Sequence, residues 1–232
     1  MPMPGHRLLY YITDRSAFPG DEANRRRCLL EKIAEAACAG VDYIQLREKD
    51  LTAGELESLT REAVRSTRHT STSPETGHSQ RETRLLINSR TDMALAVGAA
   101  GVHLRSDDIS PSDVRSIWAR GLGTPASELP ASTPIVAVSC HTPKEVAQAA
   151  VNGADFAVFA PVFEKICAPG STPAGLHALR EACRAPIPVI GLGGISLENV
   201  AFCLDAGAAG IAAIRLFQEN DIATTVGRLR SL

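Results

Sequence analysis

The stretch LLINSR, residues 85–90, begins as an apolar run and ends in a row of hydrogen-bonding side chains. Its first half is typical of a strand in a parallel sheet, because helices cover both faces of such a sheet. Its second half, Asn88, Ser89 and Arg90, would be costly to bury without partners. We therefore expect this strand to leave a packed core at its carboxyl end and to reach a shared polar pocket.

Seven more apolar segments of similar length alternate with amphipathic, helix-length segments, a pattern typical of βαβ units. The predicted strands are LLYYIT (8–13), DYIQLRE (42–48), RLLINSR (84–90), GVHLR (101–105), PIVAVSC (134–140), DFAVFAPV (155–162), PVIGLGG (188–194) and GIAAIRLF (210–217). Eight such units predict an α/β fold, a single (β/α)8 TIM barrel that forms one domain over residues 1–232. A doubly wound open sheet is the alternative, because alternation alone does not distinguish closed from open sheets.

The composition indicates which partners to expect. The chain of 232 residues is 44% hydrophobic and has a net charge of −2, so no basic field attracts nucleic acid or anionic lipid. We expect a small-molecule partner, no nucleic acid and no membrane. The cysteines show no metal-ligand spacing and no signal-type segment begins the chain, so a cytoplasmic location follows by elimination. One polar insertion, RHTSTSPETGHSQRE (68–82), has no predicted catalytic role.

The segment QLREKD, which begins at Gln45, places an amide and two cations at the end of the second predicted strand. Because side chains alternate along a strand, Gln45, Arg47 and Lys49 are expected to share one face. Such a trio suits a phosphate or a diphosphate. The alternative is that Arg47 and Lys49 only neutralise Glu48, Asp50 or other acids of the rim.

The segment GLGGIS (191–196) is a glycine-rich junction after the seventh predicted strand. Many TIM barrels bind a phosphate at this position, together with the loop after the eighth strand. Bare backbone N–H groups and a helix that begins after Ser196 as N-cap would suit a phosphate monoester. A tight turn without a ligand is the alternative.

Other polar residues follow the fourth and fifth predicted strands. Ser139 and His141 end the fifth strand, where a histidine can shuttle protons near neutral pH or cap the next helix. His103 lies on the alternating face of GVHLR. It is interpreted as a hydrogen-bonded core histidine in preference to a catalytic one. Asp107 and Asp108 either bind Mg²⁺ or cap the helix SPSDV. One carboxylate by itself is a poor Mg²⁺ site unless a substrate phosphate joins it.

Taken in order, these segments resemble the thiamine-phosphate synthase and TenI family over nearly the whole chain. The matching motifs are QLREK, LINSR on the pattern LINxR, GVHL followed by Asp, VSCHT, APVFE, PVIGLGGI and GIAAIRLF. In the synthase, the resemblance implies that a pyrimidine diphosphate loses pyrophosphate and that a thiazole phosphate captures the resulting cation. The implied contacts are Gln45 and Asn88 to the pyrimidine, Arg47, Lys49 and Ser139 to the diphosphate, Asp108 to Mg²⁺, and Gly193, Gly194, Ile214 and Arg215 to the thiazole phosphate.

Two departures from the synthase pattern concern the metal and the diphosphate. The family motif LINDR has an Asp that binds magnesium, whereas this chain has Ser89, a neutral hydroxyl. The loop after the sixth strand has Lys165, Cys167 and Ala168 where the pattern places Thr, a small hydroxyl residue and Lys. One expected diphosphate cation is therefore missing, and Lys165 is predicted to reach inward in its place.

TenI-like proteins share the barrel, lack the same metal carboxylate and have VFE after the sixth strand, as this chain does at 162–164. Their thiazole tautomerase reaction needs a positioned acid or base, for which His141 is the matching residue. We expect a divergent thiamine-phosphate synthase that uses Mg²⁺. A thiazole tautomerase and a non-catalytic barrel that binds thiazole or thiamine phosphates are the alternatives. Barrels of this type often pair, so a homodimer is one expected assembly.

Overall fold

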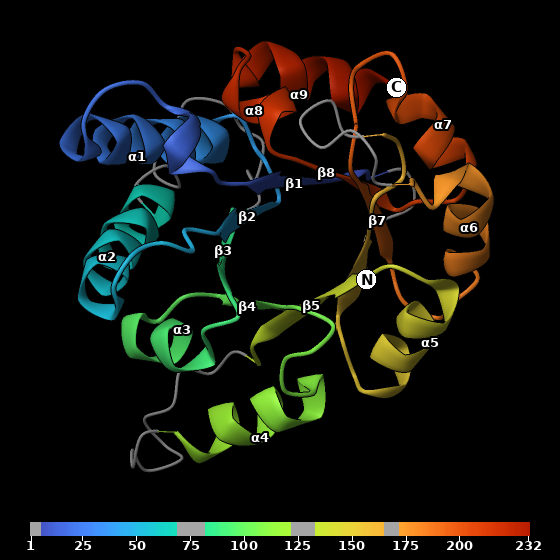
Figure 1. Ribbon diagram of the computed structural model, residues 1–232, viewed down its shortest axis with the longest axis horizontal. Helices are drawn as coiled ribbons and strands as arrows, with labels where there is room; N and C mark the ends of the chain where they lie inside the picture. Colours follow the sequence, from blue (N-terminus) through green and yellow to red (C-terminus); the bar gives the residue numbers. More distant parts are fainter. Residues whose placement is uncertain (1–5, 69–81, 122–132, 165–171) are drawn as a thin grey trace.

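A computed structural model describes residues 6–68, 82–121, 133–164 and 172–232 (Figure 1). Eight parallel strands form a closed barrel in chain order. They are β1 (Leu8–Ile12), β2 (Tyr43–Leu46), β3 (Arg84–Asn88), β4 (Gly101–Leu104), β5 (Ile135–Cys140), β6 (Phe156–Phe159), β7 (Val189–Leu192) and β8 (Gly210–Ala213). The pairing of β8 with β1, in register from Leu8 opposite Gly210, closes the ring. The predicted TIM barrel is confirmed and the open sheet is ruled out.

Helices form a ring outside the strands (Figure 1). They are α1 (Glu22–Cys38), α2 (Ala53–Arg68), α3 (Thr91–Val97), α4 (Pro111–Arg120), α5 (Pro143–Val151), α6 (Gly175–Ala182), α7 (Val200–Asp205), α8 (Arg215–Gln218) and α9 (Ile222–Ser231), with a 3-10 turn η1 (Arg15–Ala17) after β1. Side-chain caps start several of them: Ser110 accepts from Asp113 N–H at α4, and Thr142 accepts from Glu145 N–H at α5. These two caps fix where the β4–α4 and β5–α5 loops end.

The last predicted strand is too long. The apolar run GIAAIRLF continues to Phe217, but β8 ends at Ala213 and the chain turns into α8. The amides of Phe217 and Gln218 donate to the carbonyl of Ile214, and the Phe217 ring is fully buried against Tyr11. A short apolar run is compatible with a buried strand or a buried helix, so hydrophobicity alone could not place this boundary.

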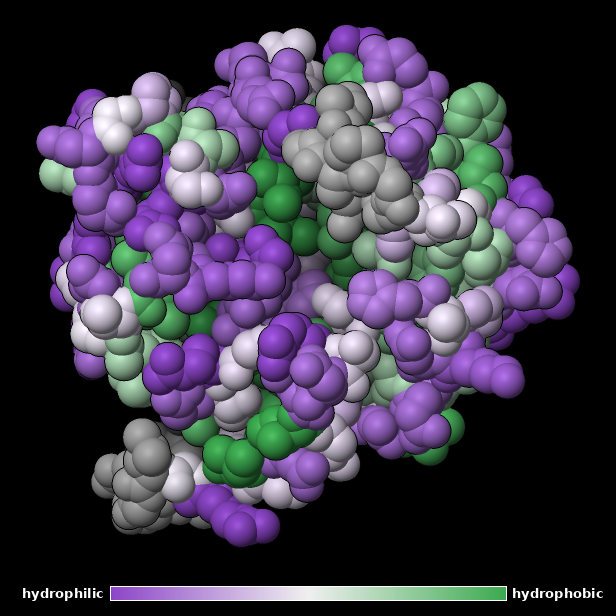
Figure 2. All heavy atoms as spheres, viewed as in Figure 1, coloured by the Kyte–Doolittle hydropathy of each residue, from purple (hydrophilic) through white to green (hydrophobic). Residues whose placement is uncertain are grey.

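Two apolar layers fill the fold, one inside the barrel and one between strands and helices. The inner layer includes Tyr10, Leu86, Phe156 and Ile190, with the Tyr10 and Phe156 rings 5.7 Å apart edge to face. Because these side chains fill the barrel interior, they leave no open channel along its axis, and we expect a ligand at the rim. Figure 2 shows that the molecule is hollowed near the barrel axis, with hydrophilic side chains around much of the hollow.

No helix in the described ranges is long and apolar enough to cross a membrane. The predicted insertion 68–82 falls almost entirely on residues 69–81, outside the described part of the chain.

Candidate active site

A row of hydrogen bonds joins the carboxyl ends of β2, β3 and β4. The side-chain amide of Gln45 donates to Asn88 Oδ1 over 2.8 Å, and the amide of Asn88 reaches Ser89 Oγ at 3.4 Å. Ser89 then donates to Asp108 Oδ2 over 2.6 Å. Ser89 has φ 57°, the left-handed region, so the chain turns sharply as it leaves β3. The structure thus brings Gln45, Asn88 and Asp108 together, as predicted, with Ser89 as the link.

Arg15 binds the acids that could have neutralised the predicted cation pair. Its guanidinium donates to both oxygens of Asp50, at 2.7 and 2.9 Å, and lies 3.4 Å from buried Glu48. Burial raises the pKa of Glu48, while hydrogen bonds from Thr13 and Arg15 oppose that rise. The alternative in which Arg47 and Lys49 merely neutralise Glu48 or Asp50 is therefore wrong.

Arg47 and Lys49 form no ion pair with any of the described residues. The pKa of Lys49 is lowered, first by the charge of Arg47, then by burial and by Arg105. These cations therefore lie close enough to repel one another, and an anion placed among them would relieve that repulsion. The closeness of Arg47 and Lys49 does not come from strand alternation, as the sequence had predicted. β2 ends at Leu46, and both residues lie in the loop that follows it.

His103 is a buried core histidine, as interpreted from the sequence. It is 1% exposed, and its two ring nitrogens each lie 2.8 Å from a hydroxyl, Nδ1 from Tyr10 and Nε2 from Ser139. Burial, helped by the charge of Arg47, lowers its pKa to about 3. His103 is therefore neutral near physiological pH.

His141 is exposed at the end of β5, with its ring held in one orientation. Its Nδ1 lies 2.7 Å from the Ala160 carbonyl. Since a carbonyl only accepts hydrogen bonds, Nδ1 bears the hydrogen. Nε2 of the neutral ring has no hydrogen-bond partner among the residues that the structure describes, so it can take a proton. The N-cap of α5 is Thr142, so the alternative role of His141 as a helix cap is wrong.

The junction after β7 is shaped by the loop that follows β6. Gly193 and Gly194 have φ of 101° and 64°, and a Cβ on Gly194 would lie 2.5 Å from the carbonyl of Glu164. Phe163 N–H donates to Gly193 O over 3.0 Å. In the described part of the chain, the backbone N–H of Gly194 has no acceptor. Both glycines are therefore required by backbone conformation and close packing.

Ser196 is not the N-cap predicted for the next helix. It lies in a turn, its N–H donates to Asn199 Oδ1 over 2.9 Å, and α7 begins only at Val200. A second bond from the Asn199 amide to Gly194 O, 2.8 Å long, closes this turn. The general preference of serine for the N-cap position misled the prediction, because Asn199 precedes the helix and takes that position.

Ile214 and Arg215 lie beside this junction, since Leu192 of β7 pairs with Ala212 of β8. Both are half-buried, and the Arg215 guanidinium has no ion-pair partner within the described ranges. Lys165, together with Cys167 and Ala168, lies outside the described residues. The predicted inward reach of Lys165 remains a prediction.

Asp108 is already engaged by protein groups. Its carboxylate accepts from Ser89, from Arg105 N–H at 2.7 Å and from the Arg105 guanidinium at 3.2 Å. Burial opposes ionisation, but these hydrogen bonds outweigh it, so the pKa of Asp108 lies below its usual value. Ser110 caps α4, which makes the alternative role of Asp107 and Asp108 as caps wrong. Among the described residues, no group of three or more His, Cys, Asp or Glu side chains is arranged to hold a metal ion.

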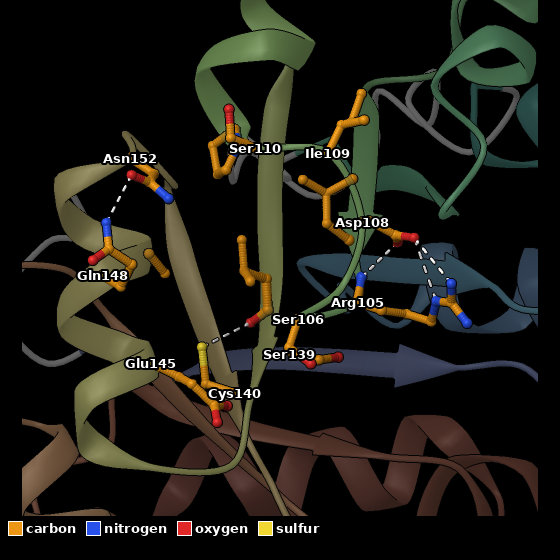
Figure 3. Close-up of a pocket in the computed structure, with 14 residues that line it drawn as sticks. Arg105, Ser106, Asp108, Ile109, Ser110, Ser139, Cys140, Glu145, Gln148 and Asn152 are labelled. Carbon is orange, nitrogen blue, oxygen red and sulfur yellow. Dashed lines mark hydrogen bonds and ion pairs between the residues drawn. The ribbon is translucent and has the colours of Figure 1, made fainter.

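A small cavity of about 160 Å³ lies between the β4–α4 loop and α5 (Figure 3). Its walls include Arg105 and Asp108 on one side and Gln148 hydrogen-bonded to Asn152 on the other. Leu104, Val138 and Cys140, which belong to the outer apolar layer, also line it, together with Ser139. Nothing in the sequence pattern indicated this cavity.

A family model described as thiamine monophosphate synthase matches residues 9–217. The chain belongs to this family. It is 35% identical over 212 residues to "Putative thiamine-phosphate synthase 2" of Aquifex aeolicus, covering 91% of this chain and 97% of that protein. A putative thiamine-phosphate synthase of Geobacter sulfurreducens is 39% identical over 208 residues, with 89% and 84% covered.

Solved structures agree with this membership. Thiamine phosphate pyrophosphorylase from Pyrococcus furiosus superposes with a TM-score of 0.73 at 26% identity, covering 97% of this chain and 94% of that one. A 3-hexulose-6-phosphate synthase, at 17% identity and a TM-score of 0.63, shows only the shared barrel.

In this member of the thiamine monophosphate synthase family, sequence reasoning missed two residues that organise the site. Arg15 was not singled out because its importance comes from Glu48 and Asp50, which are distant in sequence. Tyr10 lies within an apolar run, LLYYI, and nothing in that run distinguishes a packed tyrosine from one that bonds a histidine across the barrel.

Proposed function

We propose that this chain joins a hydroxymethylpyrimidine diphosphate to a thiazole phosphate and releases pyrophosphate. The observation that most supports this transferase activity is the pair Arg47 and Lys49, which have no carboxylate partner among the described residues because Arg15 binds Glu48 and Asp50. Unpaired cations at the rim of a barrel favour a polyanionic substrate. Family membership adds that the relatives are named for this synthesis.

In the proposed reaction, the bond from the pyrimidine methylene carbon to the diphosphate oxygen breaks, and the electron pair leaves with pyrophosphate. Arg47, Lys49 and the hydroxyl of Ser139 stabilise the departing charge. Gln45 and Asn88, fixed to each other at 2.8 Å, bind the pyrimidine ring. The thiazole nitrogen then forms the new bond to carbon, and no proton is gained or lost.

The thiazole phosphate is proposed to bind at the ends of β7 and β8. Among the described residues, the Gly194 N–H has no acceptor and Arg215 has no ion-pair partner, and both groups suit a phosphate monoester. Gly193 is proposed to contact the same phosphate through its backbone. Ile214 supplies an apolar contact for the ring. Lys165 is proposed as a further diphosphate cation.

The described residues fit Mg²⁺ poorly by themselves. Asp108 is a single carboxylate that already has Ser89 and Arg105 as partners, and Mg²⁺ requires several oxygen ligands in a strict octahedral arrangement. We propose that Mg²⁺ arrives with the diphosphate and that Asp108 is its protein contact.

One observation favours the tautomerase as a second candidate. The Ala160 carbonyl fixes the hydrogen of His141 on Nδ1, so Nε2 can accept a proton from a ring carbon of a thiazole carboxylate phosphate. In the synthase, His141 is proposed to assist at the same rim. A homodimer and a cytoplasmic location are retained as proposals for either activity.

The test is to incubate purified protein with both substrates and Mg²⁺ and to measure thiamine phosphate and pyrophosphate. Arg47→Met should lose activity, while Arg61→Met, on an exposed helix surface, should not. If the protein only accelerates thiazole aromatisation, and His141→Ala abolishes that, the tautomerase is correct. Tight binding of the substrates without either turnover would support a non-catalytic barrel.

A further inference from the structure

A chain of three side chains crosses the barrel interior from β1 to the rim of β5. The hydroxyl of Tyr10 lies 2.8 Å from His103 Nδ1, and His103 Nε2 lies 2.8 Å from Ser139 Oγ. Tyr10 and His103 are 0% and 1% exposed, whereas Ser139 is half-buried and borders the rim. The chain therefore connects the packed core to a hydroxyl that a ligand can reach.

Packing holds Tyr10 and His103 in place. Their rings stack at 5.7 Å with an interplanar angle of 26°, and Tyr43 and Phe156 each meet the Tyr10 ring edge to face. Both rings are also at most 1% exposed, so the surrounding side chains restrict their rotation. The fold therefore holds the hydrogen-bond series Tyr10–His103–Ser139 in one arrangement.

The direction of these bonds follows from the partners of Tyr10. Within the described part of the chain, His103 Nδ1 is the one hydrogen-bond partner of the Tyr10 hydroxyl. If Nδ1 bore the hydrogen, the buried Tyr10 O–H would have no acceptor, which is strongly disfavoured. Tyr10 therefore donates to Nδ1. Because buried His103 is neutral, its hydrogen lies on Nε2 and is donated to Ser139 Oγ.

These hydrogen bonds determine the orientation of the Ser139 hydroxyl. Its oxygen accepts from His103, so its own hydrogen is free to point into the pocket. If the hydrogen bond ran the other way, Ser139 would donate its hydrogen to His103 Nε2. Only its lone pairs would then face the pocket, and lone pairs repel an anion.

We propose that Tyr10 and His103 are positioning residues that set Ser139 as a hydrogen-bond donor to the leaving diphosphate. This role rests on the proposed synthase function. The hydrogen-bond direction itself does not, so the two can be tested separately.

The first test needs no substrate. In protein labelled with ¹⁵N-histidine, the ring-nitrogen signals of His103 should report hydrogen on Nε2 and none on Nδ1. Tyr10→Phe should change those signals. Tyr11→Phe is the matched control, because it removes a buried hydroxyl from the neighbouring residue, which bonds Gln218 at 3.0 Å in the outer layer. Hydrogen on Nδ1, or an imidazolium near pH 7, in the wild type would overturn the proposal even if the enzyme is active.

The second test is kinetic. A hydrogen bond to a charged group corresponds to roughly a 10- to 150-fold effect on rate, so Tyr10→Phe should lower kcat within that range. The KM for the thiazole phosphate should change little, and Tyr11→Phe should behave as the wild type. Equal kcat for Tyr10→Phe and Tyr11→Phe would overturn the proposal.

A pair of variants at His103 separates hydrogen-bond direction from packing. His103→Gln can accept from Tyr10 and donate to Ser139, whereas His103→Leu can do neither. His103→Gln should therefore retain most of the kcat that His103→Leu loses, and melting curves identify any variant that fails to fold. If the synthase assay fails for the wild type but the nitrogen signals are as expected, the function is wrong and the hydrogen-bond chain stands. Equal activity of the two folded variants would refute the positioning role.

Discussion

Replacing Ser89 by Asp tests how this chain manages its metal site. Ser89 Oγ lies 2.6 Å from Asp108 Oδ2, at a backbone φ of 57° that Asp and Asn tolerate. Ser89→Asp therefore brings two carboxylates together without new backbone strain. Ser89→Asn has the same shape without the charge and is the matched control.

The repulsion can be estimated from the structure. Two like charges about 4 Å apart repel by about 1 kcal/mol in bulk water and about 4 kcal/mol at an effective dielectric of 20. The Asp108 side chain is only 13% exposed, which favours the upper part of this range, while the Arg105 guanidinium at 3.2 Å reduces it. Ser89→Asp should therefore unfold about 1–4 kcal/mol more easily than Ser89→Asn when Mg²⁺ is absent.

Mg²⁺ should reverse the effect, because a cation between the carboxylates removes the repulsion. The same energy corresponds to roughly 5- to 1000-fold tighter Mg²⁺ binding. The assay is thermal unfolding of both variants with EDTA and with Mg²⁺ at constant ionic strength, together with titration calorimetry. Equal stability of the two variants in EDTA, or no selective stabilisation of Ser89→Asp by Mg²⁺, would refute the reasoning.

Three further predictions concern backbone, protonation and charge. Gly194→Ala should lose at least about 1–2 kcal/mol of stability, because φ is 64° and the new Cβ would meet the Glu164 carbonyl. Gly227→Ala is the control: it lies in α9 with open space around it, so it should gain about 0.5–1 kcal/mol. Chemical denaturation measures both changes in the free energy of unfolding. Burial lowers the pKa of His103 from 6.5 to about 3, so between these values only the unfolded chain takes up the proton and stability falls as pH falls. His103→Gln should remove this slope of up to about 1.4 kcal/mol per pH unit, and an unchanged slope in denaturation curves from pH 6 to 4 would contradict it. Arg15→Lys lacks the planar fork that binds both oxygens of Asp50 while reaching Glu48, so it should raise the KM for the diphosphate more than for the thiazole phosphate in steady-state assays. Equal changes would count against the charge argument.

The barrel could be predicted because each unit repeats a local pattern. Apolar runs such as LLINSR are followed by polar residues and a helix, and every one of the eight predicted strands is present. The carboxyl ends of the strands were predicted less accurately than their existence. β2 stops at Leu46 and β8 at Ala213, because the tertiary packing that ends a strand is not written in the hydrophobic pattern.

The candidate site was predictable where a residue's position on the rim determines its neighbours. Gln45 and Asn88 follow neighbouring strands, so their contact follows from the barrel alone. The partners of charged groups were not predictable, since Arg15 competes for Glu48 and Asp50 from another loop. The roles assigned to the rim residues in binding and catalysis stay predictions.

The most direct test of the central claim is a crystal structure of the protein with pyrophosphate and thiazole phosphate bound. We expect pyrophosphate to contact Arg47, Lys49 and the hydroxyl of Ser139, and the thiazole phosphate to contact Gly194 and Arg215. Pyrophosphate bound away from Arg47 and Ser139, with the rim left to solvent, would contradict the account.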